Sequence, residues 1–496
     1  MFAYAIAHCL FVILLILFIK NISDTKTISY IIFVNLCFEF ILSMILFVYT
    51  SSTGVTIYCN LGSLNILPNS VTKDIILIYD STTFSFHSIL FVALMSCLVF
   101  LIQYFEYDFN NQNIILMSSL FSQLAFIFFC TYDLFSIICL WEWISIVSFF
   151  LVQYWSIRIS TLKAAIKVFF ISQVGDFFFL ISLFLIISVF ETTDLSVILT
   201  SNYKINNLYL CNSGISYSQL ISILLSMSLF LKSAQFIFFP WLLDAMEAPV
   251  PISSQLHSST LVIIGFYVFY RFQDLIVISD TVKFIYFIFS FFTIITSTFL
   301  GFFQDDGKRL LACSTASQLG YVILCISLGF INESLLLLVF VCCNKAFTFI
   351  WFGVVMDKNG GVSDIRVYKN LKLNIFEKLG LTFSTLNSTI SLGSINWQIK
   401  GLLSKGLLVY DSNSIVLGLE ILNITWFLSS IYLIKLYLSL FSLTYKGANS
   451  VKILNNKLNL FLVNKVNSRY FFFWLVMFLV SLLLSPILNF WIILFH

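Results

Sequence analysis

Ionisable side chains occur inside long uncharged stretches of this sequence. Glu142 interrupts LFSIICLWEWISIVSFF, Lys232 lies in SLFLKSAQFIFF, and Lys345 lies in LVFVCCNKAFTFIWF. Asp176 follows a glycine in ISQVGDFFFL, and Lys405 lies in a glycine-bearing run. If these stretches cross a bilayer, each charge near its middle costs about 2.5–3.5 kcal/mol on insertion scales. We therefore predict that these ionisable residues have a chemical function in the protein. The alternative is that they form buried ion pairs or extend to the membrane surface.

The chemistry that such residues favour is proton transfer. Hydrocarbon disfavours the charged form of a lysine, whereas a nearby carboxylate favours it. A lysine therefore takes up or releases a proton when a carboxylate moves closer or farther away. His257, in QLHSST, fits this relay as a neutral carrier because an imidazole titrates in the physiological range. A single membrane histidine is more often structural, but the other buried charges favour the relay.

The composition indicates that the solvent of these stretches is a lipid bilayer. Of 496 residues, 60% are hydrophobic and 10% are charged. An ordinary soluble domain has roughly a quarter of its residues charged, and it must cover its core with polar surface. The 26 Lys and Arg and the 23 Asp and Glu are too few to form that surface. The net charge of +3 does not indicate a nucleic-acid partner, and we predict none.

No pattern in the sequence indicates a bound cofactor or metal ion. The eleven cysteines are scattered, mostly in apolar runs, and the sequence contains no CxxC motif. The four histidines are not arranged as haem ligands, and there is no GxGxxG or phosphate-binding loop. We therefore predict that this chain itself carries neither a cofactor nor a metal.

The apolar runs predict an all-α polytopic membrane protein with about fourteen transmembrane helices. Each run is long enough to cross roughly 30 Å of hydrocarbon. The N-terminal run lacks a basic segment and a cleavage site, so we interpret it as a first transmembrane helix and not as a signal peptide. The predicted helices are residues 3–19, 29–49, 83–105, 114–130, 132–156, 163–190, 218–240, 257–272, 284–304, 309–331, 333–356, 378–406, 415–443 and 470–494.

The positions of Lys232 and Lys405 indicate an internal repeat. Lys232 precedes a break at Pro240, and the second lysine lies among glycines. About five helix-plus-loop units separate the two lysines, and an odd number of crossings is the geometry of an inverted repeat with broken helices. The predicted organisation is N-terminal helices in 1–110, two five-helix repeats in 111–275 and 280–445, and a linker with a C-terminal helix in 446–496.

One long stretch resembles a known family. Residues 232–262, KSAQFIFFPWLLDAMEAPVPISSQLHSSTLV, closely resemble the diagnostic stretch of subunit 5 of proton-pumping NADH:ubiquinone oxidoreductase, respiratory complex I. The resemblance extends to DLFSIICLWEWIS (133–145), VGD (174–176), KRLLACSTASQLGY (308–321) and SDIR (363–366), with a fainter match at GLLSKG (401–406). It therefore covers at least residues 133–366.

The resemblance implies a role for most of the buried charges. Glu142 and Lys232 would form the charge pair of a first half-channel. His257 would connect this pair laterally to Lys345, the central lysine. Lys405 would be the exit-side lysine on a second broken helix.

Several positions depart from the family pattern. Asp176 matches a charged position in the sixth helix, but Gln173 stands where the family has an arginine. Val341 and Leu337 replace the two histidines that precede the central lysine, and Gly406 replaces an acidic residue. We therefore expect an intact first half-channel and an altered route from the centre to the exit.

The C-terminal end also differs from the family. Relatives continue past the fourteenth helix with a long amphipathic lateral helix and an anchoring span. Here the sequence ends at His496, directly after the last predicted helix. We expect the lateral helix to be absent, and its role to be dispensable or supplied by another polypeptide.

The resemblance implies a membrane-arm subunit of complex I in the mitochondrial inner membrane. It would translocate protons while FMN, iron–sulfur clusters and ubiquinone react in other subunits. The expected partners are lipids and other membrane-arm subunits, especially antiporter-like subunit 4. Two alternatives stay open: the large subunit of a cation/proton antiporter, and a structural scaffold with reduced pumping. The retained buried charges oppose a scaffold because such charges are costly.

Overall fold

The computed structural model describes eight stretches of the chain and six single residues between 378 and 388. The described stretches are residues 25–65, 72–104, 111–200, 216–258, 260–276, 280–358, 360–367 and 413–441.

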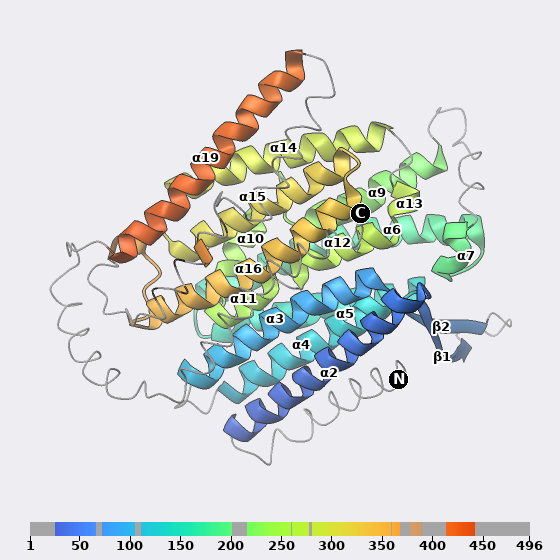
Figure 1. The fold of residues 1–496 in the computed structure, drawn as a ribbon, viewed down its shortest axis with the longest axis horizontal. Helices are drawn as coiled ribbons and strands as arrows, with labels where there is room; N and C mark the ends of the chain where they lie inside the picture. Colours follow the sequence, from blue (N-terminus) through green and yellow to red (C-terminus); the bar gives the residue numbers. More distant parts are fainter. Residues whose placement is uncertain are drawn as a thin grey trace. The chain divides into compact units, whose positions relative to one another are not determined.

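Helices form most of the described chain, as Figure 1 shows. The longer helices are α2 (Thr25–Thr53), α3 (Ser81–Tyr104), α4 (Asn111–Cys130), α5 (Leu134–Val152), α6 (Ile159–Phe190), α9 (Tyr217–Lys232), α14 (Asp280–Phe303), α15 (Gly307–Ser327), α16 (Ile331–Lys358) and α19 (Asn413–Phe441). The shorter ones are α7 (Leu195–Thr200), α10 (Pro240–Asp244), α11 (Val250–Ser258), α12 (Leu261–Arg271) and α13 (Gln273–Ile276). The predicted all-α membrane class is confirmed.

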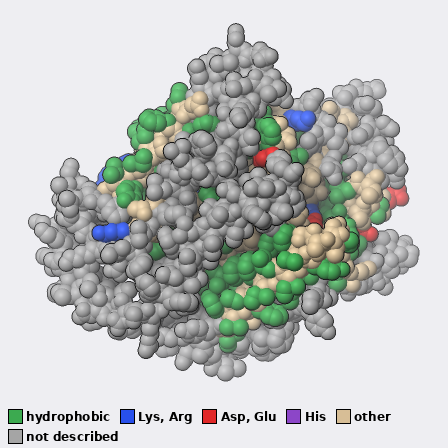
Figure 2. Space-filling view, in the orientation of Figure 1, with side chains coloured by type: hydrophobic (Ala, Val, Ile, Leu, Met, Phe, Trp, Pro, Cys, Tyr) green, Lys and Arg blue, Asp and Glu red, His purple; other side chains and the backbone are tan. Residues whose placement is uncertain are grey.

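Within the described residues, nine helical segments are long and apolar enough to cross a bilayer. Their outward faces carry apolar side chains, as lipid contact requires. On α2, Val34, Ile41 and Val48 recur every seven residues and are 63%, 58% and 60% exposed. Figure 2 shows hydrophobic side chains over much of the described surface on one face, with isolated charged ones. The chain is a multi-pass membrane protein.

A β-hairpin lies between α2 and α3, where the sequence predicted neither a helix nor a strand. Strands β1 (Ile57–Asn65) and β2 (Thr72–Tyr79) are antiparallel, with Ile57 opposite Tyr79 and Asn65 opposite Thr72. The backbone N–H of Tyr132 donates to the Ile76 carbonyl at 2.9 Å, which ties the hairpin to the α4–α5 connection. Periodicity cannot distinguish such short apolar runs from connections between helices.

Several predicted helices are confirmed with small shifts at their ends, and two are interrupted. The prediction of one helix over 218–240 is wrong because α9 ends at Lys232. The helix predicted over 257–272 is confirmed from Leu261 to Arg271 as α12, whereas His257 lies on the preceding helix, α11, which ends at Ser258. The predicted helices 3–19 and 470–494 and nearly all of 378–406 lie outside the described residues. The count of fourteen and the inverted repeat stay predictions.

The helices divide between two compact units. The first unit holds α2, most of α3, α4 to α7, α9, α10, α12, α13 and the start of α14. The second holds α11, the rest of α14, α15, α16 and α19. In the first unit, α6 packs against both α5 and α9, and α12 also packs on α9. In the second unit, α15 and α11 both pack against α16.

Candidate functional site

The first candidate site begins where α9 ends. A capping box fixes its start: Gln219 N–H donates to Ser216 Oγ at 3.3 Å, and Ser216 N–H donates to Gln219 Oε1 at 3.2 Å. The helix has 16 residues, which corresponds to about 24 Å and is shorter than the roughly 30 Å hydrocarbon layer. Its last residue, Lys232, is 3% exposed. A helix of this length that starts near one surface ends inside the membrane.

The segment after Lys232 breaks the helix at specific residues. Ala234 and Ile237 have φ values of +52° and +74°, which no α-helix contains. Pro240 then occupies the first turn of α10, where its missing N–H costs nothing. The break frees backbone carbonyls, and the Trp241 indole N–H donates to the Leu231 carbonyl at 2.9 Å. The interruption is therefore a satisfied feature of the fold, as in broken membrane helices.

Three groups from the first unit surround the Lys232 ammonium. Asp176 Oδ1, on α6, lies 2.8 Å from Nζ, and both side chains are almost fully buried. Nζ donates to Ser145 Oγ on α5 at 2.7 Å. Nζ also lies 5.0 Å from the centroid of the Trp141 ring, one turn earlier on α5. Lysine, carboxylate, hydroxyl and aromatic ring thus form one buried site.

The Asp176 carboxylate connects this site to Glu142. Its Oδ1 accepts from the Trp141 indole N–H at 2.5 Å, and its Oδ2 accepts from Gln173 Nε2 at 3.1 Å. The same Gln173 amide donates to Glu142 Oε2 at 3.3 Å. The direct ion pair of Lys232 is therefore with Asp176, and the predicted Glu142–Lys232 contact is indirect. The physical reason is that Glu142 is half-buried, whereas Asp176 faces the end of α9.

The charges of this group do not balance. Glu142, Asp176 and Lys232 together carry one excess negative charge when all three are ionised. The Gln173 amide donates to both carboxylates and so bridges them.

A second buried lysine lies in the second unit. Lys345, on α16, is 1% exposed, and its Nζ donates to Ser314 Oγ on α15 at 2.5 Å. Val341, which takes the place of a family histidine one turn before it, is buried and apolar. The hydroxyl of Ser314 is a polar neighbour that the sequence did not predict.

His257 lies on a helix that packs against the helix of Lys345. It is 2% exposed, near the end of α11, and α11 packs on α16. Ser254 Oγ, one turn earlier on α11, donates to the carbonyl of Ala346, the residue after Lys345. The structure therefore places the predicted lateral histidine and the predicted central lysine on neighbouring helices. Lys405 lies outside the described residues.

Three residues of the first site were missed by sequence reasoning. Trp141 and Ser145 carry no charge and do not stand out in an apolar sequence, and Gln173 was noted only as a departure from the family pattern. Helical spacing is the signal that could have found them: Ser145 is one turn after Trp141, and Gln173 is one turn before Asp176. Within the described residues, no three His, Cys, Asp or Glu side chains group as a metal site requires.

A family comparison matches the part of the chain that carries both sites. Residues 131–389, more than half of the chain, match the family described as NADH:quinone oxidoreductase/Mrp antiporter, transmembrane. This range includes both buried lysines described above.

Individual relatives agree with the family match. NADH-ubiquinone oxidoreductase chain 5 of Chondrus crispus is 32% identical over 293 residues, which are 58% of this chain and 44% of the relative. The chain 5 protein of Yarrowia lipolytica is 29% identical over 366 residues, which are 72% of this chain and 54% of the relative. The chain spans about half the length of these relatives.

Two solved structures share the fold. The Mrp complex from Dietzia sp. has a chain with a TM-score of 0.73 at 18% identity, over 88% of this chain and 46% of that one. An archaeal membrane-bound sulfane sulfur reductase has a chain with a TM-score of 0.73 at 17% identity, over 97% of this chain and 96% of that one. The family match, with these similarities, shows that the chain belongs to the NADH:quinone oxidoreductase/Mrp antiporter family of membrane proteins.

Proposed function

We propose that this chain is a proton-translocating membrane-arm subunit of an NADH:ubiquinone oxidoreductase. The observation that carries the proposal is the buried Lys232–Asp176 ion pair at the break between α9 and α10. A membrane protein gains little from two charges in this place unless their protonation changes during function. The names of relatives such as NADH-ubiquinone oxidoreductase chain 5 support the reaction to which the transfer would be coupled.

The proposed transfer follows from the contacts of Lys232. While Asp176 lies beside the ammonium, the protonated form is stabilised. If α9 or α6 shifts so that this distance grows, the ammonium loses its counter-charge and releases a proton. Glu142, connected through Gln173, is a further carboxylate that could exchange protons with the group.

The second lysine would continue the route. Lys345 and Ser314 supply a second buried protonatable centre, and His257 on the adjacent α11 would carry protons laterally. Lys405 would follow as the exit-side group. FMN, iron–sulfur clusters and ubiquinone would be bound by other subunits, among them the membrane-arm partners of this chain, including an antiporter-like subunit 4. The mitochondrial inner membrane is the proposed location.

Substitution of Lys232 tests the proposal. Lys232→Ala removes the titratable group but leaves most of the helix packing, so we expect the complex to assemble and the coupled proton pumping to fall at least tenfold. Lys163→Ala is the matched control because Lys163 is exposed near the start of α6. Pumping is measured in vesicles as NADH-driven acidification. Assembled Lys232→Ala protein that pumps like the wild type would instead support the scaffold alternative.

A further inference from the structure

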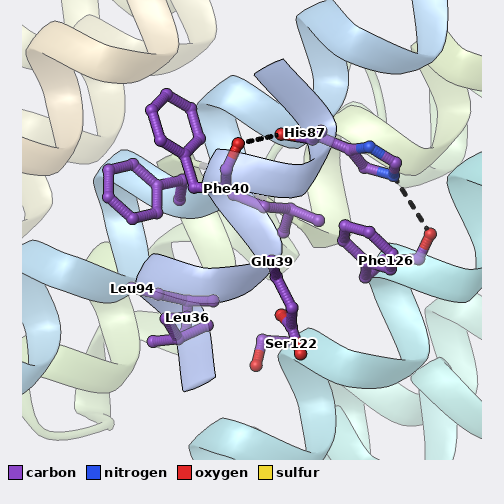
Figure 3. A pocket seen from close by; sticks show the side chains of 10 residues that line it. Leu36, Glu39, Phe40, His87, Leu94, Ser122 and Phe126 are labelled. Carbon is purple, nitrogen blue, oxygen red and sulfur yellow. Dashed lines mark hydrogen bonds between the residues drawn. The ribbon is translucent and has the colours of Figure 1, made fainter. Parts of the chain in front are cut away.

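A cavity lies among α2, α3 and α4, away from the lysine sites. It is partly open to its surroundings, and its lining leaves room for about one water molecule. Figure 3 shows side chains from all three helices around it, including Glu39 and His87. Much of the lining is apolar, but four polar residues also line it: Glu39, Ser43, His87 and Ser122.

The acidic member of this group is held by an amide. Glu39 is 5% exposed, and Gln123 Nε2 on α4 donates to its two carboxylate oxygens at 2.8 and 3.1 Å. Ser43 and Ser122 each donate their hydroxyl proton to a carbonyl of their own helix, at 2.7 and 2.6 Å. Their oxygen lone pairs therefore stay available as acceptors. The cavity offers several acceptors to a small donor.

His87 presents a nitrogen that needs such a donor. It is 3% exposed, its Nε2 lies 3.2 Å from the Phe126 carbonyl, and its ring stacks on Phe126 with centroids 4.0 Å apart. A carbonyl only accepts, so Nε2 carries the hydrogen and Nδ1 is an acceptor. Nδ1 is buried and has no hydrogen-bond partner among the described residues. Buried polar atoms of this kind in native proteins are usually satisfied by internal water.

We propose that the cavity is a hydrated proton-exchange site, in which water links the Glu39 carboxyl group to Nδ1 of His87. Internal water needs about two to four polar partners, and the carboxylate, the two hydroxyl oxygens and Nδ1 supply them. In the exchange, a proton leaves the Glu39 carboxyl group through water and binds Nδ1. The result is a carboxylate and an imidazolium that still donates from Nε2 to Phe126, so protons and charge balance.

Other titratable groups surround His87 and belong to the same electrostatic setting. The Tyr79 ring of β2 lies 5.7 Å from the imidazole, and Cys130 Sγ of α4 lies 3.5 Å from Nε2. Asp80 and Arg271 form an ion pair at 2.6 Å at the start of α3, and their opposite charges act on His87 in opposite directions. The site involves none of the residues around Lys232, so the proposal does not depend on the proposed function.

Hydration is tested first on the wild-type chain in its native membrane by X-ray hydroxyl-radical footprinting. Radicals form at bound water and oxidise the side chains beside it. We expect His87 and Phe126 to be oxidised at least fivefold faster than Phe128 and Phe179. The last two are 0% and 1% exposed, against 3% for His87 and 8% for Phe126, and they do not line the cavity. Equal, slow oxidation of all four residues would show a dry cavity and overturn the proposal.

Proton exchange is tested with a membrane-permeant carbodiimide, which reacts with protonated carboxyl groups. Labelling of Glu39 is measured by mass spectrometry over a range of pH. In His87→Leu the acceptor is lost, so we expect the labelled fraction at neutral pH to rise severalfold. Ser96→Ala, a buried hydroxyl of α3 that does not line the cavity, should label like the wild type. Identical labelling of His87→Leu and wild type, or none in either, would refute the exchange. The wild-type footprint decides hydration even if His87→Leu does not fold.

Discussion

The three neighbours of the Lys232 ammonium depend on its charge to different degrees. Asp176 and the Trp141 ring attract the ammonium as a cation, at 2.8 Å and 5.0 Å. Ser145 accepts an N–H from either the ammonium or the neutral amine, at 2.7 Å. Deprotonation therefore removes two attractions and keeps the third. The side chain would stay anchored to α5 when its contact with α6 weakens.

This geometry predicts which of the two carboxylates contributes more to stability. Asp176→Asn leaves Lys232 without its direct counter-charge, and removing one partner of a buried ion pair costs about 3–5 kcal/mol. Glu142 is half-buried and holds one 3.3 Å bond from Gln173, so Glu142→Gln should cost about 1 kcal/mol or less. We expect the larger loss of melting temperature for Asp176→Asn. Thermal unfolding of the purified protein measures it, and equal or reversed losses would contradict the assigned ion pair.

The Asp80–Arg271 pair predicts how acid affects stability. Burial raises the pKa of the Asp80 carboxyl, but the charge and hydrogen bonds of Arg271 and the bonds from Thr83 and Thr82 outweigh it, so the pKa lies below its ordinary value. The unfolded chain therefore binds more protons in acid. The stabilisation is fully present above the unfolded pKa of about 3.9 and is lost as the pH falls through the native pKa.

Asp80→Asn should remove this acid dependence. At neutral pH it should also lower the free energy of unfolding by about 3–5 kcal/mol, because buried Arg271 loses its partner. The melting temperature should fall with it. Melting temperature is measured between neutral pH and about pH 3, near the reference pKa of aspartate. Asp364→Asn is the control: the hydrogen bond from Arg366 lowers the pKa of Asp364, but the pair is largely exposed and should contribute little. A wild-type acid slope in Asp80→Asn would refute the assignment.

At the scale of elements, the break after α9 depends on close helix packing. A Cβ on Gly175 of α6 would lie 3.0 Å from Leu231 Cβ, and one on Gly265 of α12 would lie 3.3 Å from the Leu229 carbonyl oxygen. The end of α9 is thus held between two helices that approach it through glycines. That packing can maintain the strained backbone of the break.

Ile237 identifies where the strain lies. A β-branched residue at a φ of +74° costs about 1–3 kcal/mol, and the side chain is 66% exposed, so little packing offsets the cost. Glycine adopts this φ freely, but the unfolded chain gains conformational entropy, which lowers the stability of the folded protein by about 0.5–1 kcal/mol. We expect Ile237→Gly to stabilise the protein by up to about 2 kcal/mol, measured as a higher melting temperature. Ile237→Ala removes the same side chain but keeps a Cβ at positive φ, so its gain should be smaller. Destabilisation by glycine would contradict stored strain.

The elements show which parts of the fold the sequence can predict. Long uncharged runs predicted α2 to α6, α14 to α16 and α19, because lipid allows few other structures. Pro240 indicated an interruption, but the helix ends eight residues earlier, at Lys232, because tertiary bonds such as Trp241 to Leu231 stabilise the break. The β-hairpin and the separation of α11 from α12 left no periodic signal.

At the scale of the whole molecule, the buried charges were predictable and their partners were not. Glu142, Lys232 and Lys345 stand out because a charge is rare in an apolar run. The choice of Asp176 over Glu142 as the partner of Lys232 depends on how α6 packs against α9, which no single segment encodes. Uncharged partners such as Ser314 are recognisable only after the helices are assembled.

The proposed function and the antiporter alternative predict different partner proteins for this chain in the membrane. The proposed function couples proton transfer to NADH oxidation, with the flavin and iron–sulfur clusters in other subunits. We expect the full-length chain, solubilised in mild detergent and purified through an affinity tag, to cofractionate with flavin- and iron–sulfur-containing proteins and with NADH dehydrogenase activity. Flavin fluorescence and iron content of the peak fraction measure this. Lys163→Ala, the exposed control, should cofractionate equally. Recovery with cation-transport proteins alone, without flavin or iron, would contradict the proposed function. The buried Lys232–Asp176 pair would then belong to a cation/proton antiporter. In that case an ion gradient, and not electron transfer, would drive the proton transfer.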